Sequence, residues 1–71
     1  MYFSKNLRFI RQKSGLTQEE FSKLLGYSSR DGEKALETNK AKPTIEILIK
    51  LKELYKYSLD DLIFKDLSKG E

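Results

Sequence analysis

The 71-residue chain contains neither cysteine nor histidine. Without cysteine it can form no disulfide bond and offer no thiolate to a metal, and without histidine it lacks the commonest acid–base catalyst. Zinc sites of ordinary composition are therefore excluded. The carboxylates, hydroxyls and amines that remain show no catalytic constellation. We expect a protein that is not an enzyme and that binds no cofactor or metal.

Long hydrophobic runs are missing as well. No apolar segment approaches the roughly 20 residues that span a bilayer, and the opening residues MYFSKNLRFIRQ lack the continuous apolar core of a secretion signal. We therefore expect a cytoplasmic protein with no membrane partner. The formal charge is +3 at pH 7 and the isoelectric point is about 9.2. This mild positive excess permits binding to nucleic acid without demonstrating it.

What is present is a series of short segments with apolar residues at helical spacing, and none of them alternates as a strand does. We predict an all-α domain of five short helices over residues 1–67, with a frayed tail at 68–71. The first helix covers residues 4–13, before Gly15. The second opens with a capping box at Thr17 and ends at Gly26.

The last three helices are bounded by similar signals. The third covers about residues 29–38, and the fourth and fifth begin after the cap-like Thr44 and Ser58. Across the five helices, the residues expected to form the apolar faces are Phe3, Leu7, Ile10, Phe21, Leu24, Leu25, Ile45, Leu48, Ile49, Leu51, Leu54, Leu62, Ile63 and Phe64.

The second and third helices flank a brief turn that contains Gly26. Two short helices joined in this way are typical of a helix-turn-helix unit, whose second helix enters the major groove of DNA. The same spacing also fits an ordinary hairpin in a helical bundle. Spacing alone does not separate the two interpretations.

Several motifs together carry a resemblance. They are residues 10–20 (IRQKSGLTQEE), Leu25 with Gly26, Glu37 followed by Pro43, Leu48 with Leu51, and residues 58–62 (SLDDL). The combination resembles the Xre-type helix-turn-helix family, which includes the DNA-binding domains of phage lambda repressor and Cro-like proteins. The resemblance covers about residues 5–65. It implies a lambda-repressor-like domain that binds double-stranded DNA through its third helix.

The resemblance also implies roles for single residues. The glutamine that opens the second helix typically contacts a phosphate, and here it is Gln18, which otherwise belongs only to the capping box. An arginine of the first helix typically pairs with the acid that ends the third, which implies a structural ion pair between Arg11 and Glu37. The loop that follows often contacts the DNA backbone, and its residues here are Thr38, Asn39, Lys40 and Lys42.

The segment SSRDGEKALE (28–37) departs from the family pattern, because it places the acid that ends the third helix one residue too late. Counting forward makes Ser28 the cap and puts Gly32 at the position that is usually buried. Counting back makes Ser29 the cap and buries Glu33. We favour the first register and expect Glu33 to point outward, because an unpaired buried charge is costly.

In either register Arg30 and Lys34 share the outer face, one helical turn apart. Arg30 can make a bidentate contact to guanine, and Lys34 can reach a base or a phosphate. Glu33 can accept a hydrogen bond from cytosine or pair with either basic residue. The expected DNA-binding residues are Gln18, Ser28, Ser29, Arg30, Glu33, Lys34, Thr38, Asn39, Lys40 and Lys42.

These observations favour a sequence-specific, phage-repressor-like transcriptional regulator from a bacterium, a phage or another mobile element. We expect a homodimer on a pseudo-palindromic operator. Two other functions fit the same residues: an antitoxin that also binds a toxin protein, and a protein-interaction module that kept the fold without DNA binding. The residues expected at the dimer interface are Tyr57, Leu59, Ile63, Phe64 and Leu67.

Overall fold

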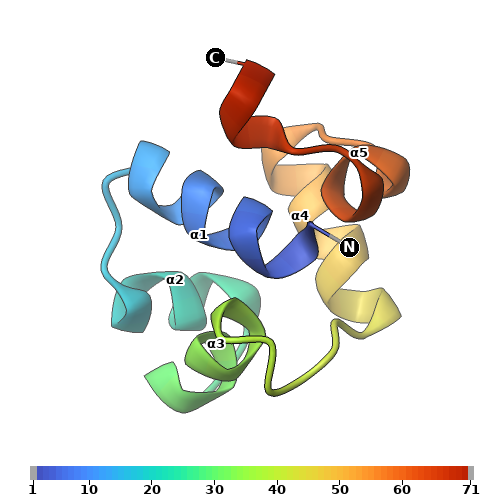
Figure 1. The fold of residues 1–71 in the computed structure, drawn as a ribbon. Coiled ribbons are helices and arrows are strands. Elements are labelled where there is room, and N and C mark those ends of the chain that lie inside the picture. Colours follow the sequence, from blue (N-terminus) through green and yellow to red (C-terminus); the bar gives the residue numbers. More distant parts are fainter. Residues whose placement is uncertain (1, 71) are drawn as a thin grey trace.

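The computed structural model describes residues 2–70, which form five α-helices and a short 3-10 helix without any strand (Figure 1). The predicted all-α architecture is confirmed, and the ends of the first and third helices lie within one residue of the predicted positions. The elements are α1 (Phe3–Lys13), α2 (Gln18–Leu25), α3 (Arg30–Glu37), α4 (Ile45–Tyr55), α5 (Leu59–Phe64) and η1 (Leu67–Gly70).

The helix starts are set by side-chain caps. The hydroxyls of Thr17, Thr44 and Ser58 accept the backbone N–H groups three residues on, at 3.1, 3.2 and 3.1 Å. In α2 the capping box is complete, because the Thr17 N–H also donates to the Glu20 carboxylate at 2.9 Å. Each such cap stabilises its helix by about 1 kcal/mol. The predicted N-caps of α2, α4 and α5 are therefore confirmed.

The turn between α2 and α3 depends on Gly26. This residue has φ +95°, a left-handed backbone conformation that residues other than glycine rarely adopt. Its N–H donates to the carbonyl of Lys23 at 3.1 Å, which closes the helix end. The chain reverses here and starts α3 at Arg30, so that α2 and α3 pack directly against each other.

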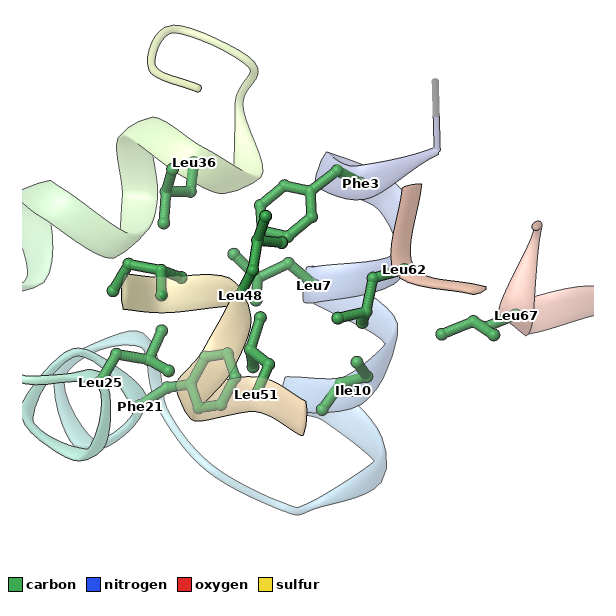
Figure 2. Packing of buried hydrophobic residues seen from close by; sticks show 11 residues of the cluster. Phe3, Leu7, Ile10, Phe21, Leu25, Leu36, Leu48, Leu51, Leu62 and Leu67 are labelled. Atoms are coloured by element: carbon green, nitrogen blue, oxygen red, sulfur yellow. The ribbon is translucent and has the colours of Figure 1, made fainter. Parts of the chain in front are cut away.

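α1 lies between two parts of the domain (Figure 1). It contacts α3 on one side and α5 with η1 on the other, while α2 also contacts α4. All five helices and η1 send apolar side chains into one interior (Figure 2). Each fully buried side chain of this kind stabilises the fold by about 1.5–3 kcal/mol. The core residues are Phe3, Leu7, Ile10, Phe21, Leu25, Leu36, Ile47, Leu48, Leu51, Leu62 and Leu67.

The predicted apolar faces of α2 and α4 are partly wrong. Ile45, Ile49 and Leu54 are 73%, 48% and 43% exposed, whereas Ile47, absent from the prediction, is buried. Apolar residues occur almost all round α4, so periodicity could not identify the buried side. In α2, Leu24 is 38% exposed although we expected it on the apolar face.

The C-terminal segment is held by polar contacts. The Asn6 side chain, fully buried, donates to the carbonyls of Leu62 and Lys65 at 2.8 and 2.6 Å and accepts the Leu67 N–H at 3.0 Å. Asp66 pairs with Lys5 at 2.8 Å. Residues 67–70 form η1, whereas the sequence predicts a frayed tail at residues 68–71; residue 71 lies outside the described residues.

Candidate nucleic-acid interface

α3 has two distinct faces. Its inner face carries Glu33, Leu36 and Glu37, which are 0%, 1% and 5% exposed. Its outer face carries Arg30 and Lys34, which are both exposed and lie one helical turn apart. The two basic side chains therefore point into solvent, as the sequence predicts.

The start of α3 has a free hydroxyl group. Ser29 is the N-cap residue in an extended conformation, yet its side chain makes no capping hydrogen bond. Ser28 and Ser29 are both exposed. The Ser29 hydroxyl, unlike that of Thr17, is thus available to an external partner.

The favoured register of α3 is wrong. Ser29 is the cap and Glu33 is fully buried, as counting back from the end of the helix predicted. Glu33 therefore cannot contact DNA in this structure, and our assignment of it to the DNA-binding residues is incorrect. The cost of burying the carboxyl is reduced because burial, together with the adjacent Glu37, raises the pKa of Glu33 to about 8 and keeps it neutral.

Gly32 is nevertheless required for close packing. A β-carbon at this position would lie 2.5 Å from Cδ1 and 2.8 Å from Cγ of the Tyr27 ring. Tyr27 is half-buried against the hydrophobic core. The glycine thus lets the tyrosine of the α2–α3 turn pack closely against the first turn of α3.

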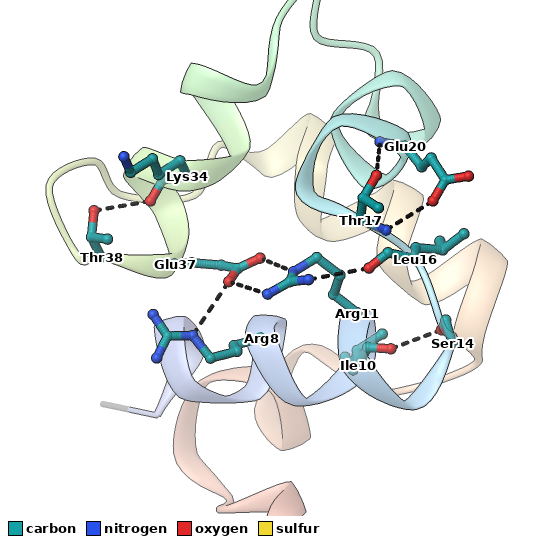
Figure 3. A network of polar contacts seen from close by, with 10 residues as sticks. All are labelled: Arg8, Ile10, Arg11, Ser14, Leu16, Thr17, Glu20, Lys34, Glu37 and Thr38. Atoms are coloured by element: carbon teal, nitrogen blue, oxygen red, sulfur yellow. Dashed lines mark hydrogen bonds and ion pairs between the residues drawn. The ribbon is translucent and has the colours of Figure 1, made fainter.

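An ion-pair network attaches α3 to α1 (Figure 3). Arg11 donates from Nε and Nη2 to the Glu37 carboxylate at 2.7 and 3.2 Å, and from Nη1 to the Leu16 carbonyl at 3.1 Å. Arg8 donates to the same carboxylate at 3.4 Å. The ion pair implied by the resemblance is therefore present, and Glu37 belongs to the scaffold.

These contacts shift the ionisation of the network. Burial alone would raise the pKa of Glu37, but hydrogen bonds from Glu33 and Arg11 outweigh it and hold the pKa below its usual value. The hydrogen bond to Glu37 raises the pKa of Arg11 against the opposing effect of burial. Glu37 and Arg11 are consequently charged over the whole neutral range.

Several polar groups of the loop after α3 form hydrogen bonds to the end of that helix. The N–H groups of Lys40 and Ala41 donate to the Ala35 carbonyl at 2.9 and 3.1 Å, and the Thr38 hydroxyl donates to the Lys34 carbonyl at 2.9 Å. Asn39 adopts a left-handed conformation with φ +62°. The exposed side chains of Asn39, Lys40 and Lys42 remain available to a phosphate, whereas the Thr38 hydroxyl is engaged within the helix end.

The N-terminus of α2 presents a second group of polar atoms. The capping box occupies the N–H groups of Thr17 and Glu20. Helix geometry leaves the N–H groups of Gln18 and Glu19 without partners inside the helix. Gln18 is itself half-buried and lies at the first helical position. It can therefore bind a phosphate while the capping box stays intact.

The residues expected at a dimer interface divide into three groups: exposed, partly buried and fully in the core. Leu59 and Phe64 are 41% and 69% exposed, whereas Tyr57 and Ile63 pack against the core in part. Leu67 is 7% exposed and belongs to the core, so its assignment to an interface is wrong. Its neighbour Asp66 anchors η1, which turns Leu67 inward.

Three structural residues escaped the sequence analysis. Arg8 and Arg11 both bind the Glu37 carboxylate. Because Arg8 lies three residues before Arg11 on the same helix, the spacing could have predicted that both face Glu37. Asn6 lies on the apolar side of α1, between Phe3 and Leu7, which marks it as a buried polar residue. No sequence signal indicated that Tyr27 covers Gly32.

Comparison with known proteins assigns the chain to a family. The model of a helix-turn-helix family matches residues 7–62, which is most of the chain. No curated protein and no solved structure gives a significant match. Across residues 2–70 none of the helices is long and apolar enough to cross a membrane. The match spans α2, the glycine turn and α3, and the chain belongs to the helix-turn-helix family of DNA-binding regulators, of the Xre and lambda repressor-like type.

Proposed function

We propose that this chain is a sequence-specific transcriptional regulator that inserts α3 into the major groove of operator DNA. One observation carries the proposal: Arg30 and Lys34 point outward from a helix whose opposite face is fixed in the core. Arg30 is suited to a bidentate contact with guanine, the commonest specific contact in the major groove. The free hydroxyl of Ser29 can bind a neighbouring base edge or phosphate.

The charge of α3 supports this proposal. The helix carries three acids, but Glu33 and Glu37 are buried on its inner face. Asp31 is the only acid of α3 exposed to solvent, and it lies in the first turn, where the helix dipole favours a negative charge. The exposed charges of α3 are therefore Arg30, Asp31 and Lys34, which sum to one positive charge.

Contacts to the DNA backbone would flank α3. Gln18 at the start of α2 and the exposed lysines of the α3–α4 loop would bind phosphates of the DNA backbone. Because few phosphates would be neutralised, we expect weak non-specific binding with a shallow dependence on salt. A homodimer is therefore needed to reach a useful affinity.

Replacing Lys40 and Lys42 together with alanine should lower the affinity for any duplex and reduce the slope of log K against log salt by about 1 for each lost contact. Fluorescence anisotropy titrations of a mixed-sequence duplex over a range of salt concentrations measure both quantities. The matched control replaces the exposed Lys65, directly after α5, and Lys69, in η1; Figure 1 shows α5 on the side of α1 away from α3. Equal losses in the two double variants would contradict the proposed DNA face.

The exposed apolar residues of α5, Leu59 and Phe64, support a homodimer through this helix. Phe64→Asp should weaken self-association by about tenfold or more, because a charge would replace a large aromatic side chain at the interface. Ile45→Asp is the control, since Ile45 is 73% exposed on α4. Sedimentation equilibrium measures association, and circular dichroism checks that both variants fold. Association that is equally weak in both variants, or unchanged in Phe64→Asp, would exclude this interface.

A further inference from the structure

Two carboxyl groups lie together in the interior, on the inner face of α3. Glu33 and Glu37 are one helical turn apart in α3, so their side chains lie on the same face, and both residues are buried. Glu37 is well supplied with donors, because Arg11 and Arg8 both bind it. Within residues 2–70, a Glu33 carboxylate has no donor within hydrogen-bonding distance of either oxygen. An ionised Glu33 would thus be a buried charge without a partner, which is strongly unfavourable.

Among the described residues, the cations near Glu33 are bound to Glu37 rather than to Glu33. From α1 the groups that act on it are Arg8 and Arg11, and every nitrogen of the Arg11 guanidinium already donates to Glu37 or to the Leu16 carbonyl. From the turn after α2 the phenol of Tyr27 faces it. The charged residues of α2 are exposed rather than buried beside Glu33; they are Glu19, Glu20 and Lys23.

We propose that Glu33 and Glu37 share one buried proton, carried by Glu33, and that release of this proton to alkaline solvent loosens α3 from the domain. A neutral Glu33 has an O–H that can donate to the Glu37 carboxylate, so both groups are satisfied. Once the proton leaves, two buried anions face Arg11 and the half-exposed Arg8. Their repulsion acts on the helix that carries both of them.

The direction of the pH effect follows from the ionisation of the folded chain. Burial first, and then the hydrogen bond and charge of Glu37, raise the pKa of Glu33 from 4.5 to about 8. Between these values the unfolded chain has released the proton and the folded chain still holds it. Stability from Glu33 is therefore complete below the lower value and is lost as the pH rises through the upper one. Within this window each pH unit lowers the folding equilibrium constant by up to about tenfold.

DNA binding would depend on pH in the same direction as the stability of the fold; this step rests on the proposed function. Arg30 and Lys34 are placed by the same helix, so a loosened α3 no longer presents them together. Affinity for DNA falls in proportion to the population that keeps α3 docked. The chain would consequently bind DNA less well in alkaline than in mildly acidic solution.

The test compares the wild type with Glu33→Gln, whose amide N–H can donate to Glu37 in place of the acid proton. Urea unfolding is measured from about pH 5 to about pH 9, a range that starts just above the ionisation of Glu33 in the unfolded chain and ends above its ionisation in the folded chain. We expect the wild-type midpoint to fall across this range and the variant midpoint to stay level. Glu53→Gln, an exposed acid on α4, is the control and should follow the wild type. A wild-type midpoint that does not fall, or a variant that falls equally, would overturn the proposal.

A second measurement uses the unmodified chain, so the test does not depend on folding of the variant. The carboxyl carbon of Glu33, followed by NMR, should titrate far above the other glutamates, and a midpoint near that of an ordinary glutamate would overturn the proposal. Duplex titrations at the same pH values then address DNA. Loss of affinity at high pH in the wild type but not in Glu33→Gln supports the coupling. Absence of DNA binding at every pH would refute the proposed function, while the folding data would still decide the shared proton.

Discussion

Replacing Arg11 with alanine is expected to lower the free energy of unfolding by about 3–5 kcal/mol, because it leaves a buried carboxylate without its main partner. The Glu37 side chain is fully buried, and Arg11, 15% exposed, supplies two of its three hydrogen bonds from arginine. Loss of the bond to the Leu16 carbonyl would add to the effect. In a domain of this size, each kcal/mol corresponds to roughly 4–8 °C in Tm. Thermal unfolding followed by circular dichroism should therefore show a very large decrease.

Arg8→Ala provides the matched control for this prediction. Arg8 binds the same carboxylate, but it is 52% exposed and its contact is longer, at 3.4 Å. Exposed ion pairs contribute about 0–1 kcal/mol, so this variant should unfold near the wild-type temperature. A double-mutant cycle with Glu37→Ala should be strongly non-additive for Arg11. Additive losses, or equal losses for the two arginines, would show that Arg11 does not anchor α3.

Arg30→Ala is expected to reduce affinity for an operator duplex by about ten- to a hundredfold, which corresponds to the 1–3 kcal/mol of a bidentate base contact. Because the Arg30 side chain is exposed and outside the core, the free energy of unfolding should stay within about 0.5 kcal/mol of the wild-type value. Arg30→Lys should recover the charge but not the bidentate geometry. Affinity should therefore stay low in the lysine variant.

The specificity of Arg30→Ala distinguishes a base contact from a phosphate contact. If Arg30 reads a guanine, the variant should bind the operator and a duplex altered at that base pair with similar affinity. Lys69→Ala, a change of the same charge outside the proposed face, should preserve the preference of the wild type. A uniform loss on both duplexes would assign Arg30 to the DNA backbone instead.

The sequence was most informative where local chemistry determines the backbone. Thr17 and Ser58 were recognisable as caps, and Gly26 as a left-handed helix end, because each depends on a few neighbouring residues. The outward placement of Arg30 and Lys34 could also be predicted, since both registers of α3 left them on the same face. The ion pair of Arg11 came from the family resemblance and not from spacing.

Sequence reasoning failed where the outcome depends on tertiary contacts. It placed Glu33 outside on the assumption of a charged carboxyl, whereas a neutral carboxyl beside Glu37 is tolerated in the interior. It placed Ile45 and Ile49 inside, because an apolar residue on the wrong side of α4 cannot be recognised from composition. The inward turn of Leu67 depends on contacts of Asp66 and Asn6 with distant residues.

Selection from a pool of random duplex DNA at physiological salt would test the central claim, that α3 reads a specific DNA sequence. We predict enrichment of two related half-sites with centres about 10–10.5 base pairs apart, the spacing that fits a symmetric dimer. In a parallel selection, Arg30→Ala should lose the preference at one position of each half-site. Retention of DNA without any enriched sequence, weakening uniformly as salt is raised, would contradict specific recognition by this helix.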